Sequence, residues 1–275
     1  MQRPFWNIEN ASGTEANRLS EPAFQHLKRL QPKKRQSSHD KIASAIGKEI
    51  LSGKYPPGST LPAESIRMRR FKVSRTVLRE VMETLSAKGL VSLRTRVGAR
   101  VLNSSDWNFF DADLLAWRVE IGMDEDLRRW LRQVRTVFEP ATAALAAHGR
   151  TAQEIEFLRD RVRRMARSEG DREKFAEADL EFHLMIGVAS RNPLMRSLAA
   201  VIEAALFASF QENPPMKGSD WAETARRHGE IVDAIEDGEA DRASAAMLRV
   251  IELGGARVAA KTGANRGKHN GSKKK

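Results

Sequence analysis

Residues 73–91 read VSRTVLREVMETLSAKGLV, and their pattern is the strongest indication of the fold in the first part of the chain. Ser74 is a good helix N-cap, because its hydroxyl can accept a hydrogen bond from an otherwise unpaired backbone amide. Gly89 suits the position just past a helix C-terminus. Between them, apolar residues recur at helical spacing, at Val77, Leu78, Val81, Met82 and Leu85. The stretch therefore predicts an amphipathic helix with one apolar and one polar face.

The segments on either side predict two more helices and a hairpin. Ile42, Ile46 and Ile50 form a single apolar stripe along a helix over 40–50, which the YPPG turn at 55–58 ends. A second helix opens near Pro62 and runs to about Phe71. Short strands at 90–93 and 100–102 flank a turn at 97–99. Three helices followed by a two-stranded hairpin define a winged helix-turn-helix.

Charge is concentrated in this module. The 275-residue chain has a formal net charge of +11, which favours an anionic partner such as nucleic acid. Residues 40–103 carry thirteen Lys/Arg against five Asp/Glu, whereas residues 104–258 carry twenty-one against twenty-eight. The chain therefore has an acidic body behind a basic module, with further basic residues at 1–39 and 259–275.

The polar face of the 75–87 helix has the chemistry of DNA reading. Arg75 and Arg79 are four residues apart, so they share one face near the helix N-terminus. Arginine can donate two parallel hydrogen bonds to guanine O6 and N7. Ser74 and Thr76 can reach phosphates, which a helix N-terminus also attracts. The alternative, a solvated basic face, fits poorly with the charge and with the helix–helix–wing order, so we expect double-stranded DNA binding.

The strings GKYPPGSTLPAE (53–64), VSRTVLREVMETLSAKGLV and RTRVGARV (94–101) resemble the DNA-binding domain of GntR-type bacterial transcription regulators. The resemblance implies that Arg75 and Arg79 read the operator and that Gly98 lies at the wing tip, in the minor groove. Two positions depart from the family pattern. Ser65 stands where a DNA-contacting Arg is frequent, and Arg67 where a core Leu is usual. Arg69 and Arg70 are the candidates to replace the lost phosphate contact.

Composition excludes several classes of protein. The chain has no cysteine, so it has no disulfide scaffold, thiol catalysis or Cys-ligated zinc. It lacks an apolar run of the roughly 18 residues that a membrane span needs, and we find no signal peptide in the first thirty residues. We therefore expect a cytoplasmic protein without a membrane partner.

The acidic body reads as helical almost throughout. Apolar stripes predict an all-α bundle of six or seven helices, and the fold class is mostly α. The expected helices cover 127–138, 154–167, 175–189, 194–210, 221–235 and 240–258. The expected organisation is a flexible basic arm (1–39), a winged helix (40–103), a linker (104–123), a helical domain (124–258) and a disordered basic tail (259–275).

Three strings in the body resemble the FCD ligand-binding domain of the FadR subfamily of GntR regulators. They are VRTVFEPATAALAA (134–147), EADLEFHLMIGVASRNPLM (177–195) and HGEIVDAIEDGEADRASAAM (228–247). The segment DWNFFDADLLAW (106–117) resembles the linker of a narrower group that responds to galactonate.

Asp179 and His183 are four residues apart on one helical face, and His228 lies on a later helix. Two imidazoles and a carboxylate can hold a divalent cation with coordination positions left open. Surface hydrogen bonding is the alternative reading of this spacing. The resemblance implies a zinc or nickel site of one Asp and three His, and here Val250 occupies the fourth position. A water or an effector carboxylate would then fill the gap.

The resemblance also places Arg135 in the effector cavity, where a guanidinium can clamp a carboxylate. A salt bridge to Glu139, one turn further on, is the alternative role for Arg135. Thr224 lies one turn before His228 and could face the same cavity. A cation and an arginine together suit a small carboxylate, with sugar acids favoured and lactate-type acids as an alternative.

We therefore expect a regulator, more specifically a repressor, that binds a near-palindromic operator as a homodimer and is released by a carboxylate effector. The residues offer no nucleophile or catalytic loop motif, so we do not expect an enzyme. Two alternatives stay open. One is a metal-dependent enzyme that uses Asp179, His183 and His228. The other is an architectural DNA-binding dimer without an effector.

Overall fold

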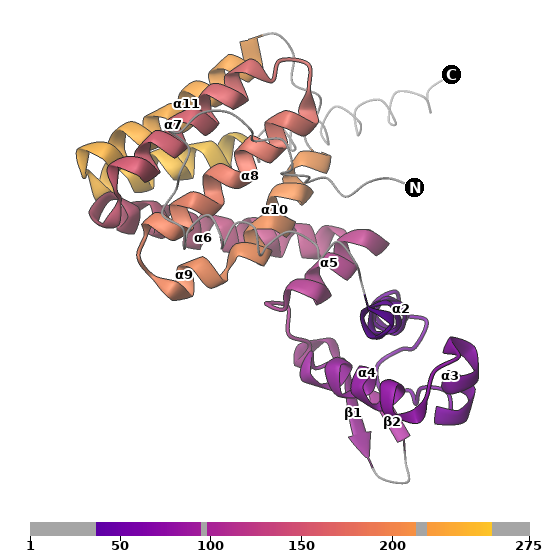
Figure 1. The fold of residues 1–275 in the computed structure, drawn as a ribbon. Helices are drawn as coiled ribbons and strands as arrows, with labels where there is room; N and C mark the ends of the chain where they lie inside the picture. The colour runs from indigo at the N-terminus through magenta and orange to yellow at the C-terminus, as the bar shows by residue number, and fades with distance from the viewer. Residues whose placement is uncertain (1–36, 95–97, 213–218, 255–275) are drawn as a thin grey trace, which may run out of the picture. The chain divides into compact units, whose positions relative to one another are not determined.

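A computed structural model describes residues 37–94, 98–212 and 219–254 (Figure 1). The described chain divides into two compact units, with the boundary between Asp124 and Glu125. The basic tail predicted at 259–275 and nearly all of the arm predicted at 1–39 lie outside the described residues. The predicted mostly α fold, a winged helix-turn-helix followed by a helical bundle, is confirmed.

The first unit contains the three predicted helices, α2 (Ser38–Leu51), α3 (Glu64–Phe71) and α4 (Arg75–Ala87). Ser37 and Asp40 form a reciprocal capping box at the start of α2. Ser74 caps α4 as predicted, accepting a hydrogen bond from the Val77 amide at 3.4 Å. Lys72 ends α3 in the left-handed conformation (φ 54°), which turns the chain sharply from α3 into α4.

The apolar stripes of α2 and α4 form the core of this unit. Ile46, Ile50, Leu78 and Leu85 are buried, together with Leu90. Arg67 is buried too, at the position where a core Leu would be usual. Its guanidinium donates from Nε to the carbonyl oxygen of Pro62 at 2.9 Å. The side chain therefore packs α3 with its aliphatic stem, while a backbone acceptor partly satisfies the charged head.

The wing is a hairpin of β1 (Val91–Arg94) and β2 (Gly98–Val101), paired antiparallel from Val91↔Val101 to Arg94↔Gly98. The sequence placed a turn at 97–99, but Gly98 and Ala99 belong to the strand. Ala99 is buried, so packing recruits it into the sheet. A bridge between Thr60 and Arg100 adds a short third segment, which sequence periodicity could not indicate from a single residue.

The segment after the wing contains a 3₁₀ turn (Ser104–Asp106) and the helix α5 (Ala112–Ile121). Asp111 caps α5 by accepting a hydrogen bond from the Leu114 amide at 3.0 Å. Leu114 and Trp117 are buried in the same core as α2 and α4. The predicted linker at 104–123 is thus packed on the winged helix, and α5 lies against α2.

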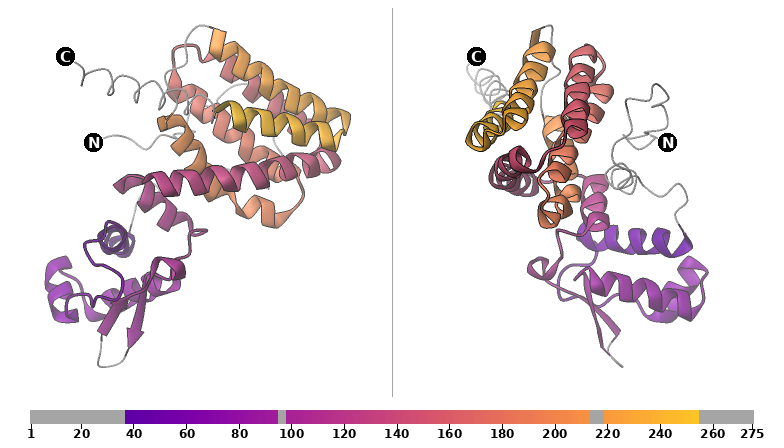
Figure 2. Two further views of the ribbon diagram at one scale, coloured as in Figure 1. Left: turned by 180° about the vertical axis from the view of Figure 1, so that it is seen from behind. Right: turned by 60° about the vertical axis from the view of Figure 1, so that its left-hand side comes forward.

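The second unit is a helical bundle (Figures 1 and 2). Its helices are α6 (Glu125–Gly149), α7 (Ala152–Arg167), α8 (Arg172–Ala189), α9 (Pro193–Ser197), α10 (Ala199–Glu212), α11 (Ser219–Asp237) and a final helix over 240–254. The single helix predicted over 194–210 is wrong, because the chain breaks at Leu198 into α9 and α10. Helix α7 packs against α8 and α11, and α8 packs against α6 and α10.

The core of the bundle contains small and large residues from these helices. Ala143 and Ala146 of α6 let α8 approach closely, where Phe182 and Ile186 fill the interior. Within the described ranges, no helix is long and apolar enough to cross a membrane. Helix α8 is central in the bundle, and the side chains that it directs inward include His183.

Candidate functional sites

The predicted reading face of α4 is open to solvent. The side chains of Arg75 and Arg79 are 81% and 79% exposed, and Ser74 and Thr76 are exposed beside them. Arg75 pairs with Glu64 at 2.8 Å and Arg79 with Glu83 at 2.9 Å. Such exposed pairs are weak, so both guanidinium groups are available to a base edge or a phosphate.

The other predicted DNA contacts divide into exposed and engaged groups. Ser65 and Arg69 are exposed on α3, and Gly98 (φ 90°) starts β2 at the wing. Arg70 instead donates to both carboxylate oxygens of Glu49 on α2, at 2.7 and 2.6 Å. This bidentate pair joins α3 to α2, so Arg70 has a structural role in the winged helix. Its predicted DNA contact and those of Ser65, Arg69 and Gly98 stay predictions.

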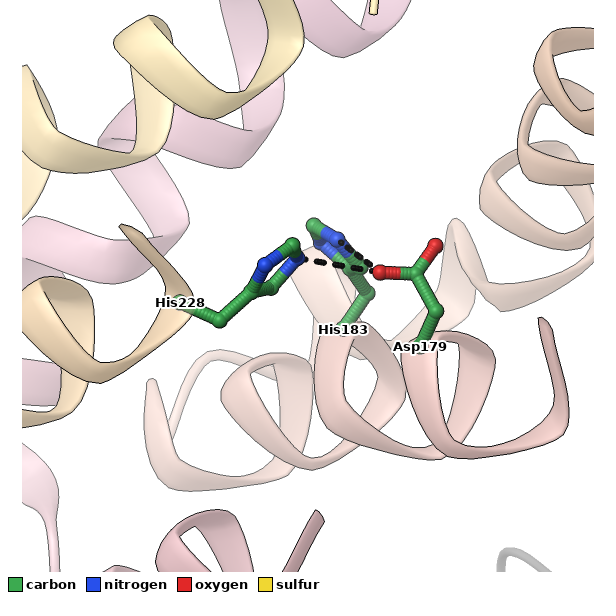
Figure 3. A group of neighbouring side chains, drawn as sticks. All are labelled: Asp179, His183 and His228. Carbon is green, nitrogen blue, oxygen red and sulfur yellow. Dashed lines mark ion pairs between the residues drawn. The ribbon is translucent and has the colours of Figure 1, made fainter. Parts of the chain in front are cut away.

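Asp179, His183 and His228 meet inside the bundle (Figure 3). Their potential ligand atoms all lie within 4.8 Å of one another. Asp179 Oδ1 is 3.0 Å from His228 Nε2 and 3.6 Å from His183 Nε2. Both imidazole side chains are only 1% exposed, and Phe182 packs edge-on against the two rings. The sequence prediction that these three residues converge agrees with this geometry.

The hydrogen bonds of His228 suit a cation. Its Nδ1 lies 2.8 Å from the backbone carbonyl of Thr224, which can only accept, so Nδ1 donates. In a neutral ring, Nε2 then carries a lone pair that faces the Asp179 carboxylate. Nε2 of His228 and both ring nitrogens of His183 have no aligned hydrogen-bond partner in the described structure. A cation placed between Asp179 Oδ1, His183 Nε2 and His228 Nε2 would give each of these atoms a partner. The three residues therefore fit a divalent cation.

Glu139 of α6 adds a second carboxylate to the site, with Oε2 2.6 Å from His183 Nδ1. Burial alone would lower the pKa of His183, but Glu139 and Asp179 raise it to about 9. Burial would raise the pKa of Asp179, yet the adjacent imidazoles of His183 and His228 hold it well below its usual range. The site therefore holds two buried carboxylates, whose negative charge a proton on His183, a metal ion or a neighbouring guanidinium can balance.

Arg135 is buried and pairs with Glu139, one turn further along α6. Burial raises the pKa of Glu139, but Arg135 and His183 outweigh it and bring the pKa to about 2. The salt bridge to Glu139, the alternative role considered for Arg135, is thus present. Thr224 positions His228 through its backbone carbonyl, while its hydroxyl donates to the carbonyl of Asp220. The effector-binding roles of Arg135 and Thr224 stay predictions.

A cavity of about 20 Å³ adjoins His183. It is lined mostly by apolar side chains, with Glu139, Thr142 and Arg196 as its other polar lining residues. This volume holds about one water molecule, far less than a drug-sized ligand requires. Val250, where the family pattern places a further ligand, packs against the apolar core.

Glu139 is the site residue that sequence reasoning did not assign. Its only signal was its spacing of four residues from Arg135, which indicates a salt bridge as readily as a site. The contact with His183 depends on how α6 packs against α8. Helix packing of this kind cannot be deduced from one sequence.

An exposed arginine-bearing helix in a winged module, followed by a separate helical domain with a buried polar site, is the arrangement of a two-domain DNA-binding regulator. Family models agree with both halves. The model described as bacterial regulatory proteins, gntR family, matches residues 39–101, and the FCD domain model matches residues 131–253. The chain belongs to the GntR family of transcriptional regulators, in the FadR-like subfamily whose members carry an FCD domain.

Relatives along most of the chain are named regulators, not enzymes. The galactonate operon transcriptional repressor of Escherichia coli is 34% identical over 77% of this chain and 93% of its own length. The uncharacterized HTH-type transcriptional regulator YieP, also of E. coli, is 36% identical over 76% of this chain and 91% of its own length. A solved structure of Lar, which controls expression of the Listeria monocytogenes agr system, shares the fold. It has a TM-score of 0.51 and 21% identity, over 82% of this chain and 98% of that one.

Proposed function

We propose that this regulator is a repressor that binds a near-palindromic operator as a dimer and is released by a small carboxylate, with sugar acids favoured. The observation that carries the proposal is the buried group of Asp179, His183 and His228, beside the Arg135–Glu139 pair. Its location in a domain that carries none of the proposed DNA-reading residues suits a sensor. The similarity to the galactonate operon repressor supports a sugar acid. Operator binding would take place in the cytoplasm.

Asp179, His183 and His228 would hold the divalent cation, zinc or nickel. A bound cation supplies Lewis acidity and attracts oxygen anions such as carboxylate and hydroxyl groups. Val250 cannot coordinate a metal, so three protein ligands leave open positions for the effector. The chain's own residues orient the site, since the Thr224 carbonyl fixes the tautomer of His228 and Glu139 holds the His183 ring.

Arg135 would take part in recognition by exchanging its partner. Its guanidinium now pairs with Glu139, and a carboxylate effector offers an equivalent bidentate acceptor. Because the cavity beside His183 holds about one water, effector binding must enlarge the space between the helices. This requirement links effector binding to a change of conformation. By thermodynamic linkage, operator DNA would weaken effector binding by the same factor.

A thermal-shift screen tests the proposal, with aldonic acids, uronic acids and lactate added to the zinc-loaded chain and to the chelator-treated chain. A ligand at about 100 times its Kd stabilises the native state by about 2.7 kcal/mol. This should raise the melting temperature by about 5 to 10 °C. We expect the shift with a sugar acid and its loss in chelator. If every acid leaves the melting temperature unchanged, the effector hypothesis fails and an architectural role is favoured.

The exposed face of α6 supports a dimer. Trp130 and Val137 are seven residues apart, so they lie on one side of the helix, and they are 48% and 67% exposed. Ile251 of the final helix, which runs beside α6 (yellow in Figure 2), lines the same surface hollow as Val137. A twofold interface needs a patch that complements itself, and an apolar helix face meets this requirement.

Val137→Glu is expected to convert the dimer to a monomer at micromolar concentration, with dimerisation weakened at least about tenfold. The reason is the cost of burying an unpaired carboxylate in an interface. Sedimentation velocity measures the change. Leu194→Glu is the matched control, because Leu194 is 76% exposed on α9 and should tolerate the charge. A Val137→Glu variant that sediments as a dimer would exclude this face.

A further inference from the structure

The end of α4 and the start of α5 share a buried ammonium group. The side chain of Lys88, the C-cap of α4, is 8% exposed. Its Nζ donates to both carboxylate oxygens of Asp111, at 2.7 and 2.9 Å, and to Asp113 at 2.8 Å. All three ammonium donors are therefore used, and the Trp117 ring lies 5.5 Å from Nζ. A buried charge satisfied in this way fixes the geometry of its partners.

Backbone contacts hold the same junction. The Asn108 amide donates to the carbonyl of Lys88 at 3.0 Å. Gly89 has φ 75°, and a Cβ there would lie 2.0 Å from the carbonyl oxygen of Asp106, so only glycine permits this approach. Asp111 serves twice, because the carboxylate that binds Lys88 also caps α5. The strand-to-helix connection is thus tied directly to the C-terminus of the reading helix.

Helix α5 is also fastened along its length to α2. Trp117 is 6% exposed and lies over Gly47, where a Cβ would come within 2.3 Å of the indole ring. Arg118 donates to the carbonyl of Leu51 at 3.3 Å, and Lys48 pairs with Glu120. These contacts end at Gly122, which has φ 99°, and a Cβ added there would have no atom within 4 Å. Helix α5 therefore belongs mechanically to the winged helix.

We propose that α5 is a rigid extension of the DNA-reading unit and the helix through which a regulatory signal reaches it. Lys88 is the positioning residue that fixes the orientation of α5 relative to α4. A conformational signal that reaches α5 would then be passed to Arg75 and Arg79, because the contacts of Lys88 hold α5 and α4 in one relative orientation. The regulatory part of this proposal rests on the proposed function. The mechanical part does not, since it concerns contacts within one compact unit.

Lys88→Met in the full-length chain tests the mechanical part, because it keeps the apolar stem and removes the ammonium. Hydrogen exchange measured by mass spectrometry should show amides of 112–121 exchanging at least about tenfold faster, as local opening becomes easier. Amides of α2 and the α4 core should keep their rates. Lys54→Met is the matched control, because Lys54 is 55% exposed and lies outside the junction. Unchanged protection of the α5 amides in Lys88→Met would overturn the proposed link between α5 and α4 through Lys88.

If Lys88→Met does not fold, Asp111→Asn gives the same test. Asparagine keeps an N-cap acceptor for the Leu114 amide but removes the charge that holds Lys88. Faster exchange over 112–121 is again expected, and unchanged exchange would contradict the link between α5 and α4 through Lys88.

Operator binding tests the regulatory part, with D-galactonate and zinc as the probe. In wild type the acid should weaken operator affinity at least tenfold, and in Lys88→Met the effect should fall below about threefold. Equal release of both proteins would show that α5 is not the route. If the acid has no effect on wild type, the effector hypothesis for this acid fails. The hydrogen-exchange result still tests the link between α5 and α4 through Lys88 independently.

Discussion

Arg75→Ala is expected to lower operator affinity by at least about 30-fold and to remove discrimination between operator and random DNA. A bidentate arginine–guanine contact contributes about 1–3 kcal/mol of discrimination. A dimer loses two such contacts, and each 1.4 kcal/mol is about a factor of ten. Arg75 is 81% exposed, so its removal should not disturb the fold. Fluorescence anisotropy with an operator obtained by selection from random duplexes measures the loss.

Two comparisons sharpen this test. Arg75→Lys should fall between wild type and Arg75→Ala, because an ammonium cannot match the guanidinium's planar bidentate geometry. Arg163→Ala on α7 removes an exposed arginine outside the winged helix and should leave affinity unchanged. Retention of full operator specificity by Arg75→Ala would mean that α4 does not read the bases through this residue.

His183→Ala and His228→Ala are each expected to weaken zinc binding by more than about 100-fold. Loss of groups that only orient a metal ligand already costs about 10 to 100-fold, and these residues are proposed as ligands themselves. Isothermal titration of the chelator-treated chain with zinc measures the effect, with circular dichroism confirming the fold. His228→Ala should disturb the rest of the site less than His183→Ala, because loss of His183 also removes its contact with Glu139.

His148→Ala is the matched control for both variants. His148 lies in the last turn of α6 and is exposed, outside the buried group. Its removal should leave zinc affinity unchanged. Equal zinc affinity in all three variants and in wild type would place any bound metal elsewhere and remove the proposed sensor centre.

Local pattern was enough to predict most of the fold. The isoleucine stripe of α2, the Ser74 cap of α4 and the apolar face of α4 each depend on neighbours within one or two turns. Predictions were incomplete where tertiary packing decides. Ala99 joins β2 because it is buried, and the packing of Trp117 against Gly47 places α5 on the winged helix.

The candidate site divides in the same way. Asp179 and His183 lie at i and i+4 on α8, so their proximity follows from helix geometry. His228 and Glu139 are brought there by α11 and α6, and helix packing decides their positions. For His228 the family resemblance supplied the missing information. The role of Lys88 had no sequence signal, since a lysine at a helix C-terminus is ordinarily a solvent-exposed charge.

The most direct test of effector-controlled DNA binding is operator affinity with and without a carboxylate. The full-length zinc-loaded chain is titrated onto its selected operator in buffer alone and in millimolar D-galactonate, galacturonate or lactate, at one fixed salt concentration, since DNA affinity depends strongly on salt. We expect one of these acids, a sugar acid in particular, to lower operator affinity at least tenfold, and chelator to abolish the effect. Equal operator affinity in every acid would show that these carboxylates do not control DNA binding.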